Sequence, residues 1–174
     1  MSNIIIESGM NFIADNAFRI EKSPLYTQLG SNVKSVEFIR AINDKLLFIE
    51  AKSSFPNPNN PAPNPNRGNK TGGELFREEI VEICDKFIHS LNLYSAVAIG
   101  VTDDTFPPDY NPPNKVSLLF ILVINGFKMT WCDEIERALT NLIRKSIYVA
   151  NIWKPEVSVI NDKIASSRGL ITKR

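Results

Sequence analysis

The architecture follows from residues 46–54, which read Leu-Leu-Phe-Ile-Glu-Ala-Lys-Ser-Ser. Four apolar residues are followed at once by Glu50, Ala51 and Lys52. Side chains alternate between the two faces of a strand, so Glu50 and Lys52 project from the same face. A strand that is apolar along its length and ends in an acid and an amine is typical of a functional site as well as of a core. These residues therefore predict a buried β-strand with a charged end.

A second apolar segment, residues 33–42, lies just upstream and contains one acid, Glu37. The dipeptide Asn43–Asp44 separates the two segments and favours a tight turn, because both residue types tolerate positive φ better than most. With this dipeptide as the loop, the pairing places Glu37 directly opposite Glu50 and on the same face as Lys52. The sequence thus predicts a β-hairpin whose open end gathers two acids and an amine.

The remaining segments predict an α/β fold with a mixed central sheet flanked by helices. We expect strands over 3–7 and 17–21, a short helix over 24–29, a long amphipathic helix after the capping box of Thr71 and Glu74, a buried strand over 116–125, a helix over 130–145, a strand over 157–160 and a helical turn capped by Asp162. The long helix is expected to reach Gly100, and the alternative is a break near Asn92 with a strand over 96–101. Residues 55–73, rich in Pro and Asn, predict a long loop beside Lys52 that is either functional or mobile.

Length and composition set the class of protein. At 174 residues, with 43% hydrophobic and 22% charged residues, the chain is expected to form a single domain over residues 1–174. Two cysteines without a CxxC pair indicate neither a disulfide framework nor a zinc site, so a cytoplasmic protein is expected. The N-terminus has no basic region followed by a long apolar stretch, and no apolar run reaches about 18 residues. Neither a signal peptide nor a membrane span is therefore expected, and no membrane partner.

The set Glu37…Glu50-Ala51-Lys52 resembles the PD-(D/E)xK phosphodiesterase superfamily, the fold of many restriction enzymes, Holliday-junction resolvases and related nucleases. The resemblance implies a restriction-endonuclease-like fold and a nuclease, such as an endonuclease, that depends on Mg²⁺ or Mn²⁺. It also implies that Glu37 and Glu50 bind the metal, that the carbonyl of Ala51 adds a ligand, and that Lys52 is the catalytic amine. Glu21 is the candidate for a further metal-binding acid.

Two features depart from the pattern of that superfamily. Glu37 stands where the superfamily usually has Asp, and Val36 precedes it in place of Pro. The physical case is separate from the resemblance: opposed carboxylates repel, and a divalent cation between them would remove that cost. Such a cation lowers the pKa of bound water, and Lys52 could stabilise charge on a phosphate. The alternative interpretation is a surface ion pair between Glu50 and Lys52.

The whole chain is also similar to a set of uncharacterised bacterial proteins, which implies no function. The shared segments are Ile-Glu-Lys-Ser, Glu-Ala-Lys-Ser-Ser and Val-Ile-Asn-Gly, here residues 20–23, 50–54 and 123–126.

DNA is the expected substrate of the nuclease hypothesis, with RNA as the alternative, and Arg67, Lys70 and Arg77 are candidates for contact with a phosphate backbone. Neutralised phosphates dominate nucleic-acid affinity, so a net charge of +1 indicates a homodimer or a targeting partner subunit. The second hypothesis is a catalytically inactive nuclease-fold module that binds protein or nucleic acid. Its contact surface would be the Pro/Asn-rich loop or the tryptophans, Trp131 and Trp153.

Overall fold

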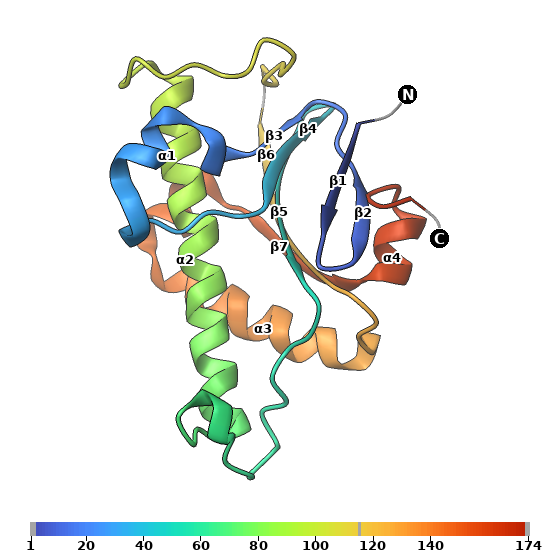
Figure 1. The fold of residues 1–174 in the computed structure, drawn as a ribbon. Coiled ribbons are helices and arrows are strands. Elements are labelled where there is room, and N and C mark those ends of the chain that lie inside the picture. Colours follow the sequence, from blue (N-terminus) through green and yellow to red (C-terminus); the bar gives the residue numbers. More distant parts are fainter. Residues whose placement is uncertain (1–2, 115, 173–174) are drawn as a thin grey trace.

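The computed structural model describes residues 3–114 and 116–172. Within these residues, five strands form a mixed sheet in the order β3-β4-β5-β6-β7, and β1 and β2 form a separate hairpin (Figure 1). The elements, in chain order, are β1 (Ile4–Glu7), β2 (Met10–Ile13), β3 (Ala17–Phe18), a 3-10 turn (Ile20–Lys22), α1 (Pro24–Leu29), a 3-10 turn (Gly30–Asn32), β4 (Phe38–Ile42), β5 (Lys45–Lys52), a 3-10 turn (Pro65–Arg67), α2 (Gly72–Ala98), β6 (Ser117–Ile124), α3 (Met129–Lys145), a π-helical segment (Val149–Trp153), β7 (Glu156–Asn161) and α4 (Asp162–Ser167). The expected mixed sheet flanked by helices is confirmed.

The predicted hairpin forms with the predicted register. Strand β4 pairs antiparallel with β5, and Ile39 lies opposite Phe48. Asn43 in the turn has a φ of 52°, which Asn tolerates. The last pair at the open end joins Phe38 to Ile49, so Glu37 lies one residue beyond the ladder. The turn thus determines which residues of the two strands share a face.

Strands β5, β6 and β7 run parallel, with α2 and α3 as the connections between them. Their carboxyl ends therefore lie at the same edge of the sheet, where Lys52 pairs with Ile124 and Ile124 with Asn161. Strand β6 is the middle one and is buried over most of its length, as its unbroken apolar sequence predicts. The charged end of β5 therefore lies among the carboxyl ends of parallel strands, where open α/β sheets commonly bind ligands.

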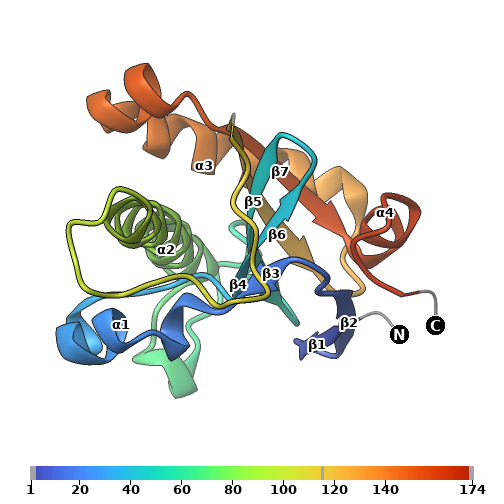
Figure 2. The ribbon, with the colours of Figure 1, turned by 90° about the horizontal axis from the view of Figure 1, so that it is seen from above.

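Each face of the sheet is covered by different elements. Helices α2 and α3 lie on one face, and the β1–β2 hairpin and α4 lie on the other (Figures 1 and 2). On the α2 side, Phe120 stacks on Phe87 with ring centroids 4.7 Å apart. On the opposite side, Phe12 packs edge-to-face against Phe38 at 5.3 Å. Alternation along β5 places Phe48 and Glu50 on the α2 side.

Three local expectations need correction. The strand expected over 17–21 ends at Phe18, because the chain then turns and buries Ile20 in the core beside α2. Residues 33–37 are not a strand, because the backbone N–H of Val36 donates to the side chain of Ser90 on α2 (2.9 Å). Asn161, not Asp162, caps α4, since its side chain accepts the N–H of Ile164.

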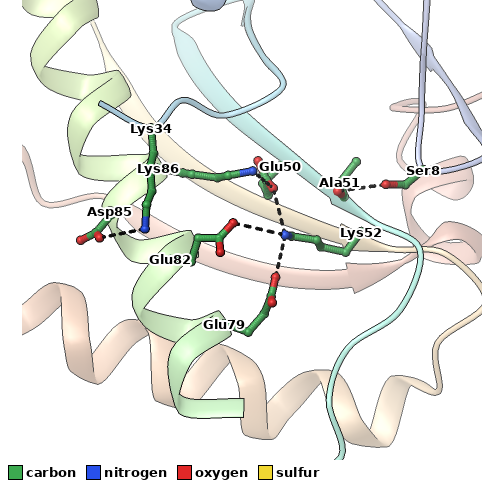
Figure 3. Close-up of polar contacts among 9 residues, drawn as sticks. All are labelled: Ser8, Lys34, Glu50, Ala51, Lys52, Glu79, Glu82, Asp85 and Lys86. Atoms are coloured by element: carbon green, nitrogen blue, oxygen red, sulfur yellow. Dashed lines mark hydrogen bonds and ion pairs between the residues drawn. The ribbon is translucent and has the colours of Figure 1, made fainter. Parts of the chain in front are cut away.

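The long helix α2 continues past Asn92, where the sequence allowed a break followed by a strand. It runs unbroken from Gly72 to Ala98, so no strand forms over 96–101. The capping box at its start is present in both directions, between Thr71 and Glu74. This helix lies beside β5 on one face of the sheet (Figure 1), and Figure 3 shows its polar side chains close to Glu50 and Lys52.

The loop that precedes α2 is folded on itself. The side chains of Asn57, Asn60 and Asn64 each accept a hydrogen bond from the backbone N–H two residues further on. Its end is fixed where the N–H of Gly72 donates to the carbonyl of Asn60 (2.9 Å). A Cβ at Gly72 would overlap the carbonyl oxygen of Asn57, so glycine is required at this close approach.

Strand β7 is one edge of the sheet, and the side chains of Glu136 and Arg168 contact it. The carboxylate of Glu136 on α3 accepts the N–H of Val159 (2.9 Å), and the guanidinium of Arg168 donates to the hydroxyl of Ser158 (3.3 Å). The other edge, β3, is two residues long. None of the described helices is both long enough and apolar enough to cross a lipid bilayer.

Candidate functional site

Charged side chains from β5 and α2 meet at the carboxyl end of β5. Strand β5 contributes Glu50 and Lys52, and α2 contributes Glu79, Glu82 and Lys86 (Figure 3). Residues 79, 82 and 86 are three and four positions apart, so they lie on one face of the helix. That face is turned towards the strand end, which explains why the five groups come together.

Glu50 is fully buried, with 0% of its surface exposed. Nζ of Lys86 lies 2.6 Å from its Oε1, and Nζ of Lys52 lies 3.8 Å from the same oxygen. The other oxygen, Oε2, is buried and has no hydrogen-bond partner among the described residues. Burial raises the pKa of Glu50 to about 7, the Lys86 ammonium opposes that rise, and the charge of Glu37 adds to it.

Lys52 connects this buried acid to the carboxylates of α2. Its Nζ lies 2.6 Å from Oε1 of Glu79 and 3.8 Å from Oε1 of Glu82. Burial lowers the pKa of Lys52, but the hydrogen bond to Glu79 and the neighbouring negative charges outweigh burial, so its pKa stands above the ordinary value. Lys52 is therefore held as an ammonium group at the centre of an acidic cluster.

An open hollow of about 510 Å³ adjoins the strand end. Its lining includes Lys52 and Glu79, as well as Glu37, which lies just beyond the last hairpin pair. Arg67 from the Pro/Asn-rich loop lines the same hollow. Glu50 lies behind these residues, so Lys52 is the cation that both approaches the buried acid and faces the open space.

The structure thus brings Glu37, Glu50 and Lys52 close together, as the hairpin register predicts. The charge of Glu37 acts on Glu50, and Glu37 shares the hollow with Lys52. Ala51 also lines this hollow, and its carbonyl accepts a hydrogen bond from the hydroxyl of Ser8 (3.0 Å). Glu21 is engaged elsewhere, because its carboxylate pairs with Arg19 (3.7 Å).

The three predicted phosphate contacts have different positions. Arg67 faces the hollow. Lys70 is paired with Glu78 on α2 at 2.5 Å, which ties the loop to the helix. Arg77 is exposed on the first turns of α2, where its charge lowers the pKa of Glu74, after the larger effect of the hydrogen bonds from Thr71. Of the three, Arg67 is the one placed beside Lys52.

Sequence reasoning missed the contribution of α2. The sequence predicts the apolar face of this helix but assigns no role to Glu79, Glu82 or Lys86. A signal was available, because these positions border the buried Phe76, Ile83 and Phe87 in the same stretch. Polar residues at the margin of an apolar stripe lie nearest the sheet, and so reach its edge.

The residues at this site fit a divalent cation at one point. A hard cation such as Mg²⁺ prefers carboxylate and carbonyl oxygens, and Oε2 of Glu50 is such an oxygen without a partner. The other oxygen of this carboxylate, Oε1, already accepts a hydrogen bond from Lys86. Among residues 3–114 and 116–172, no group of three or more His, Cys, Asp or Glu side chains is arranged to hold a metal ion.

Comparison with protein-family models, with curated proteins and with solved structures finds no match to this chain. Function is therefore inferred from the side chains themselves. A buried acid with a raised pKa, an ammonium group held beside it and an adjoining open hollow mark this end of β5 as the candidate functional site.

Proposed function

We propose that this protein is a metal-dependent phosphodiester hydrolase with a restriction-endonuclease-like fold, and that its substrate is a nucleic acid, DNA in the first place. The observation that carries the proposal is the unpartnered, fully buried Oε2 of Glu50, which lies beside Lys52 at the carboxyl end of a parallel strand. An unsatisfied buried carboxylate oxygen is costly, so its retention favours a role in binding a cation. The order of hairpin, helix and parallel strand supports the fold.

Each side chain then has a role. Glu50 and Glu37, with the carbonyl of Ala51, would hold Mg²⁺ or Mn²⁺. When bound, such an ion lowers the pKa of water and polarises a phosphoryl oxygen. Lys52 donates hydrogen bonds to the scissile phosphate and stabilises the negative charge that develops there.

Residues outside the reacting centre orient the site and the substrate. Lys86 holds Oε1 of Glu50 and so fixes the direction of Oε2. Glu79 positions the ammonium of Lys52 at the wall of the hollow. Arg67 faces the same space and binds a neighbouring phosphate of the backbone.

A second candidate function is a non-catalytic module that keeps the fold and binds protein or nucleic acid. The observation that favours it is the closed set of short ion pairs. Lys86 contacts Glu50 and Lys52 contacts Glu79, each at 2.6 Å. Side chains that neutralise one another in this way have less to offer a reacting phosphate.

Cleavage assays distinguish the two candidates. Plasmid and single-stranded DNA are incubated with Mg²⁺ or Mn²⁺ and wild-type protein, Lys52→Ala, Glu50→Gln or Lys45→Ala. Lys45 is exposed at the opposite end of the same strand and serves as the matched control. We expect cleavage by the wild type and Lys45→Ala, and a loss of about 100-fold or more in the other two. Equal rates in all four folded proteins would overturn the nuclease proposal.

A further inference from the structure

A small aromatic cavity lies beside the hollow at the end of β5. Its volume is about 140 Å³, and its walls come from the Pro/Asn-rich loop and the starts of α2 and α3. The residues that matter here are Phe55, Pro56, Phe76, Phe127, Trp131 and Glu134. Ligand pockets for whole small molecules are typically about 300–1,000 Å³, so this cavity suits a single planar ring.

The cavity adjoins the candidate site. Phe55 and Pro56 line both the aromatic cavity and the hollow that contains Lys52. A molecule whose phosphate lies against Lys52 can therefore extend a neighbouring group past Phe55 into the cavity.

The walls of the cavity offer ring faces and edges rather than a closed core. Trp131 is 47% exposed, although it packs edge-to-face against Phe127 at 5.3 Å. Phe55 and Phe76 form a second edge-to-face pair at 5.6 Å. An exposed indole held by a neighbouring ring is a rigid platform on which a planar group can stack.

Two cations, Lys128 and Arg67, lie near the cavity, while the acid Glu134 lines it. Nζ of Lys128 lies 4.9 Å from the centroid of the Trp131 ring, and Arg67 faces the adjoining hollow. These cations provide contacts for backbone phosphates on either side of a stacked base. An apolar peptide side chain would need no such cations.

We propose that this cavity binds an unstacked nucleobase of a single-stranded nucleic acid whose backbone passes the Lys52 site. The inference deepens the proposed function and rests on it for the position of the phosphate. A base within a duplex is paired and stacked on both sides and cannot enter a single-ring cavity, so the substrate class is single-stranded or locally opened DNA.

Glu134 adds a preference among bases. Its carboxylate lines the cavity and can accept hydrogen bonds but cannot donate them when ionised. The exocyclic amine of cytosine is a donor, whereas thymine presents a carbonyl at the same position. Cytosine is therefore favoured over thymine in this cavity.

The test measures binding in the presence of a chelator, so that cleavage plays no part. Full-length protein is titrated with fluorescent oligo(dC), oligo(dT) and a blunt duplex, and anisotropy is recorded for the wild type, Trp131→Ala and Trp153→Ala. Trp153 is the matched control because it is also exposed, at 41%, but lies on the π-helical segment after α3. We expect Trp131→Ala to weaken oligo(dC) binding roughly 5- to 100-fold, and Trp153→Ala to leave it unchanged.

Two further measurements secure the result. The chain has two tryptophans, so Trp153→Phe leaves Trp131 as the sole indole, and oligo(dC) should quench its fluorescence. Glu134→Gln should remove a preference of roughly fivefold or more for oligo(dC) over oligo(dT). Equal affinity in the two alanine variants, or duplex binding as tight as single-strand binding, would overturn the inference. Binding that depends on Trp131 without any cleavage would uphold it and refute the hydrolase.

Discussion

Nζ of Lys86 lies 2.6 Å from Oε1 of Glu50, and Oε2 of the same buried carboxylate has no hydrogen-bond partner among the described residues. One oxygen is therefore neutralised while the other is left unsatisfied. Because burial raises the pKa of Glu50 to about 7, the charge on this carboxylate changes near neutral pH. The stability of the fold should depend on both Lys86 and pH.

Replacement of Lys86 by Met should destabilise the protein strongly. A buried ion pair that loses one member leaves an uncompensated charge, which costs about 3–5 kcal/mol. The loss should be greatest above about pH 8, where Glu50 is ionised, and smaller near about pH 5, where protonation relieves it. Urea unfolding monitored by circular dichroism measures both values.

Lys34→Met is the control for this prediction. Lys34 also pairs with an acid on α2, since its Nζ lies 3.4 Å from Oδ2 of Asp85, but both side chains are 42% exposed (Figure 3). A surface pair of this kind contributes less than about 1 kcal/mol. An equal loss of unfolding free energy in the two methionine variants would show that the buried pair contributes no more to stability than the surface pair.

The stability of the wild type should fall as pH rises through neutrality because of Glu50. The pKa of Glu50 is raised from 4.5 to about 7 in the folded protein, so the folded state binds the proton more tightly than the unfolded state. Its contribution is complete below about pH 4.5 and is lost as pH rises through about 7. The total is of the order of 3 kcal/mol.

Glu50→Gln should flatten this part of the pH–stability curve, because the amide does not titrate. Glu78→Gln, which removes an exposed carboxylate paired with Lys70, should retain the wild-type slope. Unfolding free energies measured at several pH values across this window provide the comparison. A wild-type slope that persists in Glu50→Gln would mean that another group is responsible.

Gly72→Ala should disrupt the loop before α2. The new Cβ would overlap the carbonyl oxygen of Asn57, so the loop must move and the hydrogen bond from Gly72 to Asn60 is strained. We expect a loss of about 1–3 kcal/mol, as for other overpacked sites. Thermal unfolding measures it.

The next residue provides the matched control. At Gly73, the nearest atom to a new Cβ is the carbonyl oxygen of Pro58 at 3.3 Å, which requires only a small shift. Alanine also favours the helix by about 1 kcal/mol over glycine, so Gly73→Ala should be close to neutral. Equal losses at the two positions would show that the close approach at Gly72 does not constrain the loop.

The hairpin was predictable because its register depends on local chemistry. The Asn43–Asp44 turn determines the parity of pairing, and parity determines that Glu50 and Lys52 share a face with Ile39 and Phe48. The approach of Glu37 to Glu50 follows from the same arithmetic. The register of the hairpin depends only on residues close together in the chain, so it can be predicted from a single sequence.

The partners of those residues were not predictable in the same way. Whether Lys86 or Asp85 faces the strand end depends on the rotation of α2 about its axis, which is decided by the packing of Phe87 on Phe120. That contact joins residues distant in sequence. The segment before β4 was misjudged for a related reason, because its N–H groups bind Ser90 and His89 of α2 rather than a strand.

The side chains that occupy the edge strand β7 also affect how copies of this protein meet. A strand from a second molecule could extend the sheet only by pairing with the free backbone groups of β7. The N–H of Val159 is already taken by Glu136, and Arg168 lies over Ser158. An incoming strand would have to displace the Glu136 carboxylate to pair with Val159, and the opposite edge offers two residues. The sheet is thereby protected against edge-to-edge polymerisation at high concentration.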